Sequence, residues 1–387
     1  MFECFKNTLK REIKLLCSRK LYLFGMLLIP LSVLFFLTSL MESGIPQHIP
    51  TALVDMDNTM ETREIIRLLD SSPEVDIVEK KNSYAEALDL MKKGKVYGIF
   101  VIPPSFTKDV AAGRDIQISY YTNSTFYIPG SLLFKGLKTT AKLTSAAAIK
   151  TYLIEVGASK QQVQNLLQPV NFQTVELNNP WTHYSVYLST SFVPCALALL
   201  IFLCTCYSIC SEEKRGTSRE WLASSGDSIV MALTAKLLPQ TVVFTAVGVF
   251  SQAYMFGFLD YPLNGSVFNI VLAMILFVLA NQAMGILVSG VMPNLRFSLS
   301  ICSLIGMLSF SIGAFSFPME YMYGSIGIFS YIIPSRYYFL IYVDQAFNGL
   351  PMYYSRFYYM ALLVFLLLPL FVLKRLYKAH KKPVYVP

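Results

Sequence analysis

The sequence predicts an α-helical membrane protein with six transmembrane helices and an inserted extracytoplasmic α/β domain that includes long helices. Hydrophobic residues make up 54% of the 387 residues and charged residues 14%, whereas soluble domains carry about 25% charged residues. Apolar windows of about 20 residues, long enough to cross a bilayer as helices, recur along the chain. These windows are residues 21–40, 186–209, 234–257, 267–290, 298–317 and 357–373.

The segment 42–185, between the first two windows, has an ordinary soluble composition and is long enough to fold around its own core. Apolar or alternating stretches predict strands, as in "PTALVDMD" (50–57), "VDIVEK" (75–80), "VYGIFVIPP" (96–104) and "DIQISYYTN" (115–123). Helical patterns separate the first three of them. This order predicts a small, mostly parallel sheet covered by helices.

The helices expected in this domain begin at recognisable caps. Asn58 or Thr59 caps the first helix, and Ser83 with Glu86 three residues later forms a capping box for the second. From about 128 to 167 the pattern becomes helical again and predicts long helices.

Positive charge at the two ends of the chain predicts the orientation in the membrane. Residues 1–20 contain six basic and two acidic side chains, and the tail 374–387 contains five basic side chains and no acid. Lysine and arginine close to membrane ends stay in the cytoplasm, so both termini are expected there. The net charge of +8 is thus a topology signal rather than a sign of nucleic-acid binding. A cleaved signal peptide is the alternative for the first window, but "SLMESGIP" offers no small-residue cleavage site.

Motifs of catalysis or metal binding are weak in this sequence. The external domain has no cysteine and so folds without disulfides. Cys206 and Cys210, four residues apart, could pair on a metal, but packing of small side chains in a membrane helix is the simpler interpretation. "SFTK" (105–108) lacks the companion motifs of acyl-serine enzymes, and the three histidines are far apart. We expect neither an enzyme nor a cofactor site.

The charged stretch "SICSEEKRGTSREWLASSGDS" (208–228) interrupts the apolar part of the chain. With the amino terminus inside, residues 211–228 form a cytoplasmic loop. Gly216 breaks the segment, and Thr217 or Ser218 can cap a short helix that places Trp221 among charged neighbours. Such a helix suits docking into a groove on a partner. The alternative is an ordinary interfacial loop with Trp221 at the lipid headgroups.

Three stretches carry a resemblance to a known family. They are "EEKRGTSREWL" with the downstream "AKLLP", the late "GAFSFPMEYMYGSIGIFSYIIPSRYYF", and the external "ALVDMD…YAEALDLMKKGKVYGIFVIPPSFTKDV". Together they resemble the membrane permeases of type-2 ABC transporters, in particular the exporter-type members with a large external domain after the first span. The sequence departs from the family pattern at Ser225-Gly226, Ala235 and Tyr323.

The resemblance implies that the 211–228 loop holds a coupling helix seated on a separate ABC ATP-binding subunit. ATP and magnesium would then be bound by that partner. Residues 1–20 resemble an amphipathic connecting helix on the inner membrane face. The residues assigned to ATPase coupling are Glu212, Glu213, Lys214, Arg215, Gly216, Thr217, Glu220, Trp221 and Leu222.

The resemblance also implies external re-entrant helices over 318–354, which fits a segment broken by glycines and prolines. A second permease copy or a paralogue would complete the pathway, and a periplasmic adaptor is an optional partner. The expected location is a bacterial inner (plasma) membrane. The residues assigned to an external gate are Phe317, Pro318, Glu320, Pro334, Arg336 and Tyr337.

The expected substrate is hydrophobic or amphipathic, such as a drug or a lipid, because the spans are rich in Phe, Met and Leu. Spans two to six hold essentially no ionised side chain at mid-depth, which argues against ion coupling. Gln240, Asn281 and Gln282 are candidate pathway residues, and Gln252 and Asn269 are further polar positions. For each of them an interhelical hydrogen bond is the simpler role. The rival function is a cell-envelope receptor or scaffold, which a neighbouring gene for an ATP-binding subunit would argue against; an enzyme is a distant third.

Overall fold

The computed structural model describes residues 2–40, 44–112, 114, 117–155, 157, 178–179, 183–313, 315 and 319–383. The chain divides into two compact units. One comprises Ser43–Val175 and is the inserted α/β domain. The other comprises Met1–Glu42 with Glu176–Pro387 and is helical.

The α/β unit contains one mixed sheet. Among the described residues, its four strands lie in the order β2-β1-β3-β4. Strand β1 pairs in parallel with β2 and β3, and β4 pairs antiparallel with β3. The mostly parallel sheet that the sequence predicts is therefore present. Its elements are β1 (Ile49–Asp55), α4 (Met60–Asp70), β2 (Val75–Lys81), α5 (Tyr84–Lys92), β3 (Gly98–Ile102), α6 (Phe106–Ala111), β4 (Ser119–Thr122) and α7 (Tyr127–Glu155).

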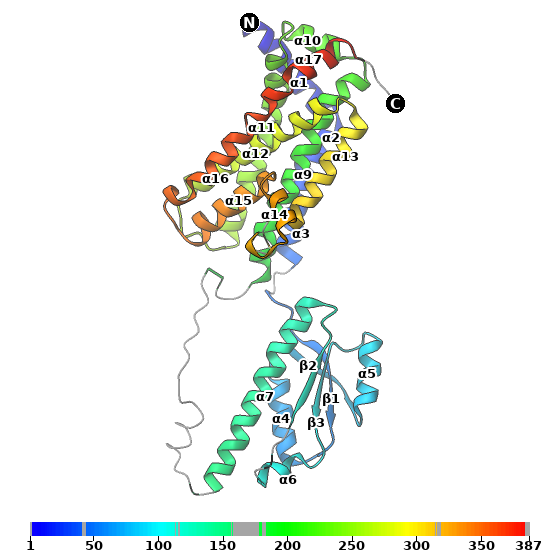
Figure 1. Cartoon of the computed structure of the whole chain (residues 1–387), viewed down its shortest axis with the longest axis vertical. Coiled ribbons are helices and arrows are strands. Elements are labelled where there is room, and N and C mark those ends of the chain that lie inside the picture. The colour runs from blue at the N-terminus through cyan, green and yellow to red at the C-terminus, as the bar shows by residue number, and fades with distance from the viewer. Residues whose placement is uncertain are drawn as a thin grey trace. The chain divides into compact units, whose positions relative to one another are not determined.

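Helices cover both faces of this sheet (Figure 1). Side chains alternate along β1, so Leu53 packs with Leu69 of α4 and Leu133 of α7, while Val54 packs with Leu90 of α5. One long helix, α7, follows the sheet within the described residues, and the rest of that prediction lies outside them. The sheet core is thus built from two hydrophobic clusters, one on each face.

Local signals explain the starts of its helices. Thr59 accepts a hydrogen bond from the backbone N–H of Thr62, and the Thr62 side chain accepts one from the backbone N–H of Thr59. Ser83 accepts from the backbone N–H of Glu86. Thr59 and Ser83 are therefore confirmed as caps, and the reciprocal bond of a capping box is present at Thr59.

Asp57, just after β1, ties this end of the sheet to α6. Its carboxylate accepts hydrogen bonds from the hydroxyl and the backbone N–H of Thr107, at 2.6 and 2.9 Å. The bond from the Thr107 hydroxyl is the main cause that lowers the pKa of Asp57. Ser105 precedes α6 with a left-handed backbone and is the start of that helix, as expected.

The other unit consists of helices. Within the described part of the chain, six are long and apolar enough to cross a membrane, which confirms the predicted fold class. These six are Lys20–Leu40, Tyr184–Lys214, Ile229–Phe258, Val267–Val291, Leu295–Ile312 and Met352–Phe371. The helical elements of the unit are α1 (Phe2–Ser18), α2 (Lys20–Leu23), η1 (Phe24–Leu28), α3 (Ile29–Leu40), α9 (Tyr184–Lys214), α10 (Ser218–Ser224), α11 (Ile229–Ala253), η2 (Tyr254–Phe258), α12 (Val267–Val291), α13 (Leu295–Ile312), η3 (Met319–Tyr321), α14 (Gly324–Ser330), α15 (Pro334–Tyr342), η4 (Val343–Phe347), α16 (Met352–Phe365), η5 (Leu368–Phe371) and α17 (Leu373–Lys381).

Helices α9 and α12 form the centre of this unit. About two thirds of the apolar window of each is buried, whereas the windows of α3 and α16 are mostly exposed. Close approach depends on small residues: a Cβ added at Gly285 of α12 would lie 2.9 Å from Cγ2 of Thr205 in α9. The outer helices present large apolar side chains such as Phe36 and Phe357 to their surroundings, as lipid-facing helices do.

The segment between α13 and α16 is broken into short helices. Helix α14 and the continuous pair α15–η4 are inclined at 83°. Gly324 begins α14, and Pro334 occupies the first turn of α15, where a proline fits without a lost hydrogen bond. These helices lie within the range expected for re-entrant helices.

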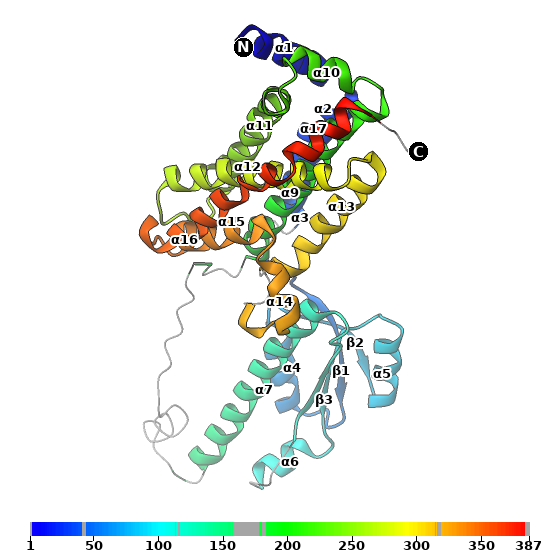
Figure 2. The ribbon, with the colours of Figure 1, turned by 45° about the horizontal axis from the view of Figure 1, so that its top comes forward.

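The first and last described helices, α1 and α17, lie at one end of the helical unit. Figures 1 and 2 show α1, α10 and α17 gathered there, with α14 toward the opposite end. An even number of spans produces this arrangement.

Candidate coupling site around helix α10

The connection from α9 to α10 differs from the expected loop. Helix α9 continues to Lys214, so Glu212, Glu213 and Lys214 are its last turn, and α10 begins only at Ser218. Gly216 ends α9 with φ of +71°, a left-handed conformation that favours glycine. The short helix expected near Glu213 is therefore two pieces, a helix end and a separate helix.

One face of α10 is buried in the helical unit. Trp221 and Leu222 are 0% and 2% exposed, and they pack in one cluster with Leu233 of α11 and Leu376 of α17. The expectation that Trp221 is exposed, either for docking on a partner or at the headgroups, is wrong. The one apolar edge of this seven-residue helix packs in the core of the helical unit itself.

A buried cluster of four charges lies beside α10. Nζ of Lys236, on α11, is 2.8 Å from Oε2 of Glu12 on α1 and 2.8 Å from Oε1 of Glu212 on α9. Arg11 of α1 binds Glu212 through both terminal nitrogens, at 3.2 and 2.9 Å. The two acids and two bases balance. Since all but Arg11 are less than 6% exposed at the side chain, these pairs are shielded from solvent.

The same cluster holds α10. The hydroxyl of Thr217, the residue before α10, donates to Glu212 instead of capping the helix. Nζ of Lys236 also lies 4.7 Å from the ring centre of Trp221, a cation–π contact. Burial lowers the pKa of the Arg11 guanidinium, but the hydrogen bond and charge of Glu212 outweigh this effect and raise it overall. One cluster thus fixes α1, α9, α10 and α11 to one another.

His380 fixes α10 from the other side. Its Nδ1 is 3.1 Å from the hydroxyl of Ser218, and its ring meets Trp221 edge to face at 5.0 Å. Burial is the main cause that lowers the pKa of His380 from 6.5 to about 4; the charge of Glu212 opposes it to a smaller extent, and the charge of Lys236 lowers the pKa slightly further. His380 is therefore neutral at physiological pH.

Acidification is expected to destabilise the helical unit partly through His380. Between pH 6.5 and about 4 the unfolded chain binds a proton at this residue that the folded chain does not, so stability falls as the pH falls. The loss approaches about 3 kcal/mol at the acid end of the window. The measurement is the thermal midpoint of the purified chain against pH, for the wild type and for His380→Asn. We expect a shallower slope in the variant, and equal slopes would contradict the assignment.

Apart from Thr217, which is partly buried, the residues assigned to coupling fall into two groups. Glu212, Glu213, Trp221 and Leu222 are buried, whereas Lys214, Arg215, Gly216 and Glu220 are exposed. Arg219, which the sequence reading left out, is exposed beside Glu220. We call Lys214, Arg215, Arg219 and Glu220 the charged rim.

The residues assigned to an external gate are placed only in part. Phe317 and Pro318 lie outside the described residues. Glu320 is exposed in η3, and Pro334 begins α15. Arg336 is 9% exposed, with its guanidinium 4.3 Å from the ring centre of Tyr331, and the hydroxyl of Tyr337 donates to the Tyr331 carbonyl. Arg336 and Tyr337 thus join the start of α15 to the end of α14.

The candidate pathway residues Gln240, Asn281 and Gln282 are all buried. Gln282 accepts a hydrogen bond from Thr241 across α11 and α12, and Asn281 donates to the carbonyl of Phe277 in its own helix. Each of the three still has one side-chain polar atom without a hydrogen-bond partner. The hydrogen bond from Thr241 is therefore an interhelical partner for one polar atom of Gln282. Among the described residues, Gln240 and Asn281 have no interhelical hydrogen bond of this kind.

Cys206 and Cys210 are buried free thiols within α9, as packing of small side chains in a membrane helix predicts. Sγ of Cys206 lies 3.0 Å from Sγ of Cys302 on α13, and both are free thiols. Among the described residues, no group of three or more His, Cys, Asp or Glu side chains could hold a metal ion.

Five residues of the site were not assigned from the sequence: Arg11, Glu12, Arg219, Lys236 and His380. Lys236 left a usable signal, because a lysine within an apolar helix demands a buried partner. His380 left none, since its partner Ser218 is 162 positions away.

Comparison with protein families identifies the family of this chain. The model of a family described as "ABC-2 family transporter protein" matches residues 20–373. That range includes all six candidate spans, the inserted domain and α10. Comparison with curated proteins gives no match. The chain therefore belongs to the ABC-2 transporter family and is a multi-pass membrane permease of an ABC transporter, a system that also contains an ATP-binding subunit.

Proposed function

We propose that the charged rim, at the end of α9 and the start of α10, docks on the separate ATP-binding subunit and that the chain is the permease of an exporter. The proposal is based on two features that occur together: the charged rim is exposed, and the other face of α10 is packed firmly in the helical unit. Lys214, Arg215, Arg219 and Glu220 face outward, while Trp221 and Leu222 anchor the same short segment inside. Complementary charge at such a rim serves recognition of a partner.

The contacts that hold α10 explain how ATP binding in the partner would move the membrane-spanning helices. Lys236, Glu12, Glu212 and Arg11 lock α10 to α1, α9 and α11 through buried ion pairs. A displacement of α10 must therefore move those helices or break pairs that are costly to separate. Packed elements with buried polar links are the physical means by which one site moves another.

The cargo proposed here is hydrophobic or amphipathic and moves outward. Lys236 is the charged side chain buried in α11, and it is paired, so no free charge in that helix is left to carry an ion. Gln240, Asn281 and Gln282 supply neutral polar atoms among apolar neighbours. The broken α14–α15 segment, with Glu320, Pro334, Arg336 and Tyr337, is proposed as an external gate, to which the sequence adds Phe317 and Pro318.

The proposed location is a bacterial plasma membrane, with both termini and the basic α17 in the cytoplasm. A second permease copy or paralogue completes the pathway, and a periplasmic adaptor could extend it. ATP and magnesium belong to the partner subunit.

Reversing charge on the rim is expected to release the ATP-binding subunit. Arg215→Glu with Arg219→Glu places acids where the partner meets bases, and like charges across an interface cost several kcal/mol. We expect the subunit that co-purifies to fall about tenfold or more. Because both arginines are exposed, the thermal midpoint of the permease should stay within its error.

A matched control carries the same charge change nearby. Lys374→Glu with Lys378→Glu reverses two exposed charges on α17, at the same end of the unit. This control should retain the ATP-binding subunit. Equal retention by both double variants would refute docking on the rim, and loss from both would show that general charge at this end governs binding.

A further inference from the structure

Helix α17 carries exposed basic side chains that play no part in the proposed coupling. We call Lys374, Arg375, Lys378 and Lys381 the basic face; all four are exposed, and the exposed Lys382 follows directly. At about 100° of rotation per residue, the four positions fall within an arc of about 120° around the helix. Among the described residues, no carboxylate lies within ion-pair distance of any of them. The basic face is therefore free to meet an anionic partner.

The opposite side of α17 is packed in the helical unit. Leu376 and His380, one turn apart, are 0% and 1% exposed. Leu376 lies in the same hydrophobic cluster as Trp221, and Nδ1 of His380 meets the hydroxyl of Ser218. Because these contacts hold α17 in place, the basic face is preformed, and a ligand does not have to order it.

The basic face begins where the lipid-facing surface of the last span ends. Leu367, Leu370 and Phe371 are 54%, 63% and 81% exposed, as side chains in contact with hydrocarbon are. Lys374 comes three residues after Phe371, and from there to the end of α17 every exposed side chain is basic. Three residues of helix advance about 5 Å, comparable to a headgroup layer of about 5–8 Å. The basic face therefore starts at the level of the lipid headgroups.

This arrangement goes beyond what the topology of the chain requires. Positive charge anywhere near the end of the last span would keep this end in the cytoplasm. Here the cations share one exposed face next to lipid-exposed side chains, and lysine stems are long enough to turn their ammonium groups toward the headgroups. A layer of lipid phosphates complements such a face, and it is within reach without any further protein.

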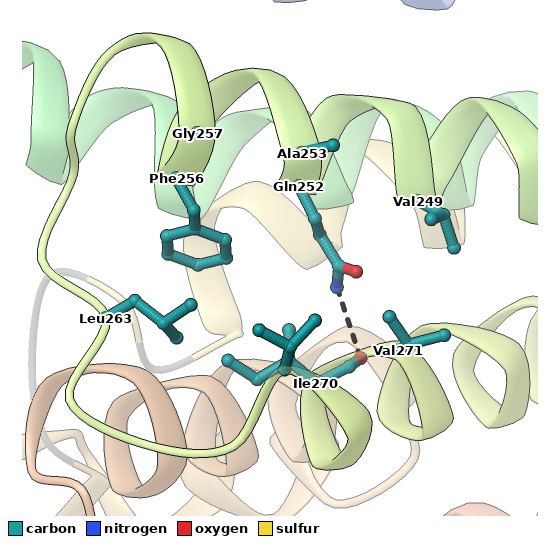
Figure 3. A pocket seen from close by; sticks show the side chains of 9 residues that line it. Val249, Gln252, Ala253, Phe256, Gly257, Leu263, Ile270 and Val271 are labelled. Carbon is teal, nitrogen blue, oxygen red and sulfur yellow. Dashed lines mark hydrogen bonds between the residues drawn. The ribbon is translucent and has the colours of Figure 1, made fainter.

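The hollow between α11 and α12 differs in this respect. Its described lining residues carry no charge: apolar side chains such as Val249 and Phe256 form most of the wall, and Gln252 donates to the carbonyl of Ile270 (Figure 3). Apolar side chains accept the tails of all phospholipids alike, so this wall does not distinguish one headgroup from another. The basic face of α17 is where the charge of a lipid would be recognised.

We propose that the basic face of α17 binds the phosphate headgroups of anionic phospholipids in preference to zwitterionic ones. Each lysine or arginine close to an anionic surface raises the binding constant about fivefold, and salt weakens the effect. The site needs neither the ATP-binding subunit nor nucleotide, so its test is independent of the proposed coupling.

The test is a titration of the purified full chain, in nonionic detergent, with fluorescent phosphatidylglycerol. The comparison probe is phosphatidylcholine with the same acyl chains and the same fluorophore. Because the two probes differ in the headgroup alone, the ratio of their dissociation constants isolates headgroup recognition. We expect phosphatidylglycerol to bind at least about tenfold more tightly at low salt, with a smaller preference at high salt.

Removing charge from the basic face should remove this preference. In the triple variant Lys374→Gln, Arg375→Gln and Lys378→Gln, we expect the ratio to fall about tenfold or more. Because all three side chains are exposed, the thermal midpoint should stay unchanged. The charge-preserving variant Lys374→Arg with Lys378→Arg should keep the preference.

A matched control removes the same charge from the α/β domain. Lys92→Gln with Lys95→Gln and Lys108→Gln changes three exposed lysines there and should keep the preference. Equal binding of the two probes by the wild type would overturn the proposal. A preference that survives in the α17 triple variant would also overturn it and assign the lipid to another surface. Loss of the preference in both triple variants would show that net charge, not the basic face, selects the lipid.

Discussion

Lys236→Met is expected to lower the free energy of unfolding of the helical unit by about 3–5 kcal/mol. The substitution keeps the length of the side chain but removes the cation that lies 2.8 Å from both Glu12 and Glu212. Two buried carboxylates then share Arg11 alone. A buried pair adds little net stability when formed, but an unpaired buried charge is costly, so the loss exceeds that of an ordinary core substitution. The measurement is the thermal or denaturant midpoint of the purified chain.

Restoring charge balance separates this electrostatic cause from loss of packing. In the double variant Glu12→Gln with Lys236→Met, the pair of Arg11 with Glu212 remains and the cluster is neutral again. We expect it to be more stable than Lys236→Met by about 1–3 kcal/mol. Lys10→Met, an exposed lysine on α1, is the control and should not change the midpoint. A double variant that is less stable than Lys236→Met would show that packing by the lysine stem, not charge, governs the site.

The same single variant should weaken coupling. With Lys236 gone, α10 loses its cation–π contact and the cluster loses its link to α11. Transport should therefore fall even at temperatures where the variant remains folded. That combination would identify Lys236 as a positioning residue, since it lies inside and cannot touch the partner.

Most of the fold could be predicted because it depends on local sequence. Apolar windows mark the spans, and the alternation of strands and helices, with Thr59 and Ser83 as caps, marks the inserted sheet. The end of α9 could not be placed in the same way. Glu212 and Glu213 look like loop residues, yet the helix continues through them because Lys236 and Arg11, from other helices, compensate the buried charge of Glu212. Only the tertiary structure supplies those partners.

The site shows the same division. Gly216 as a helix stop and the existence of a short helix after it follow from local rules. Which face of that helix is buried does not, because seven residues give too short a pattern to distinguish an apolar edge for a partner from one for the unit's own core. Thr217 was expected as a possible cap and instead donates to Glu212, a choice set by packing.

Trp221→Ala is expected to cost about 3–5 kcal/mol of stability, as removal of a large buried aromatic side chain does. The ring is 0% exposed and fills the space between Lys236, His380 and Leu376. Without the ring, α10 is no longer held against the helical unit. Binding of the ATP-binding subunit should therefore also be lost, although Trp221 does not face that subunit. The measurement is the thermal midpoint of the permease purified alone, alongside co-purification of the ATP-binding subunit.

Trp221→Phe separates packing from surface recognition. Nε1 of Trp221 has no hydrogen-bond partner in the structure, so phenylalanine loses some volume but no hydrogen bond. We expect a cost below about 1.5 kcal/mol and retention of the ATP-binding subunit. The rim variant Arg215→Glu with Arg219→Glu gives the opposite pattern, an unchanged midpoint with loss of the partner. If Trp221→Ala instead leaves the midpoint unchanged and still loses the partner, Trp221 contacts that partner directly and the inward-facing packing of α10 is wrong.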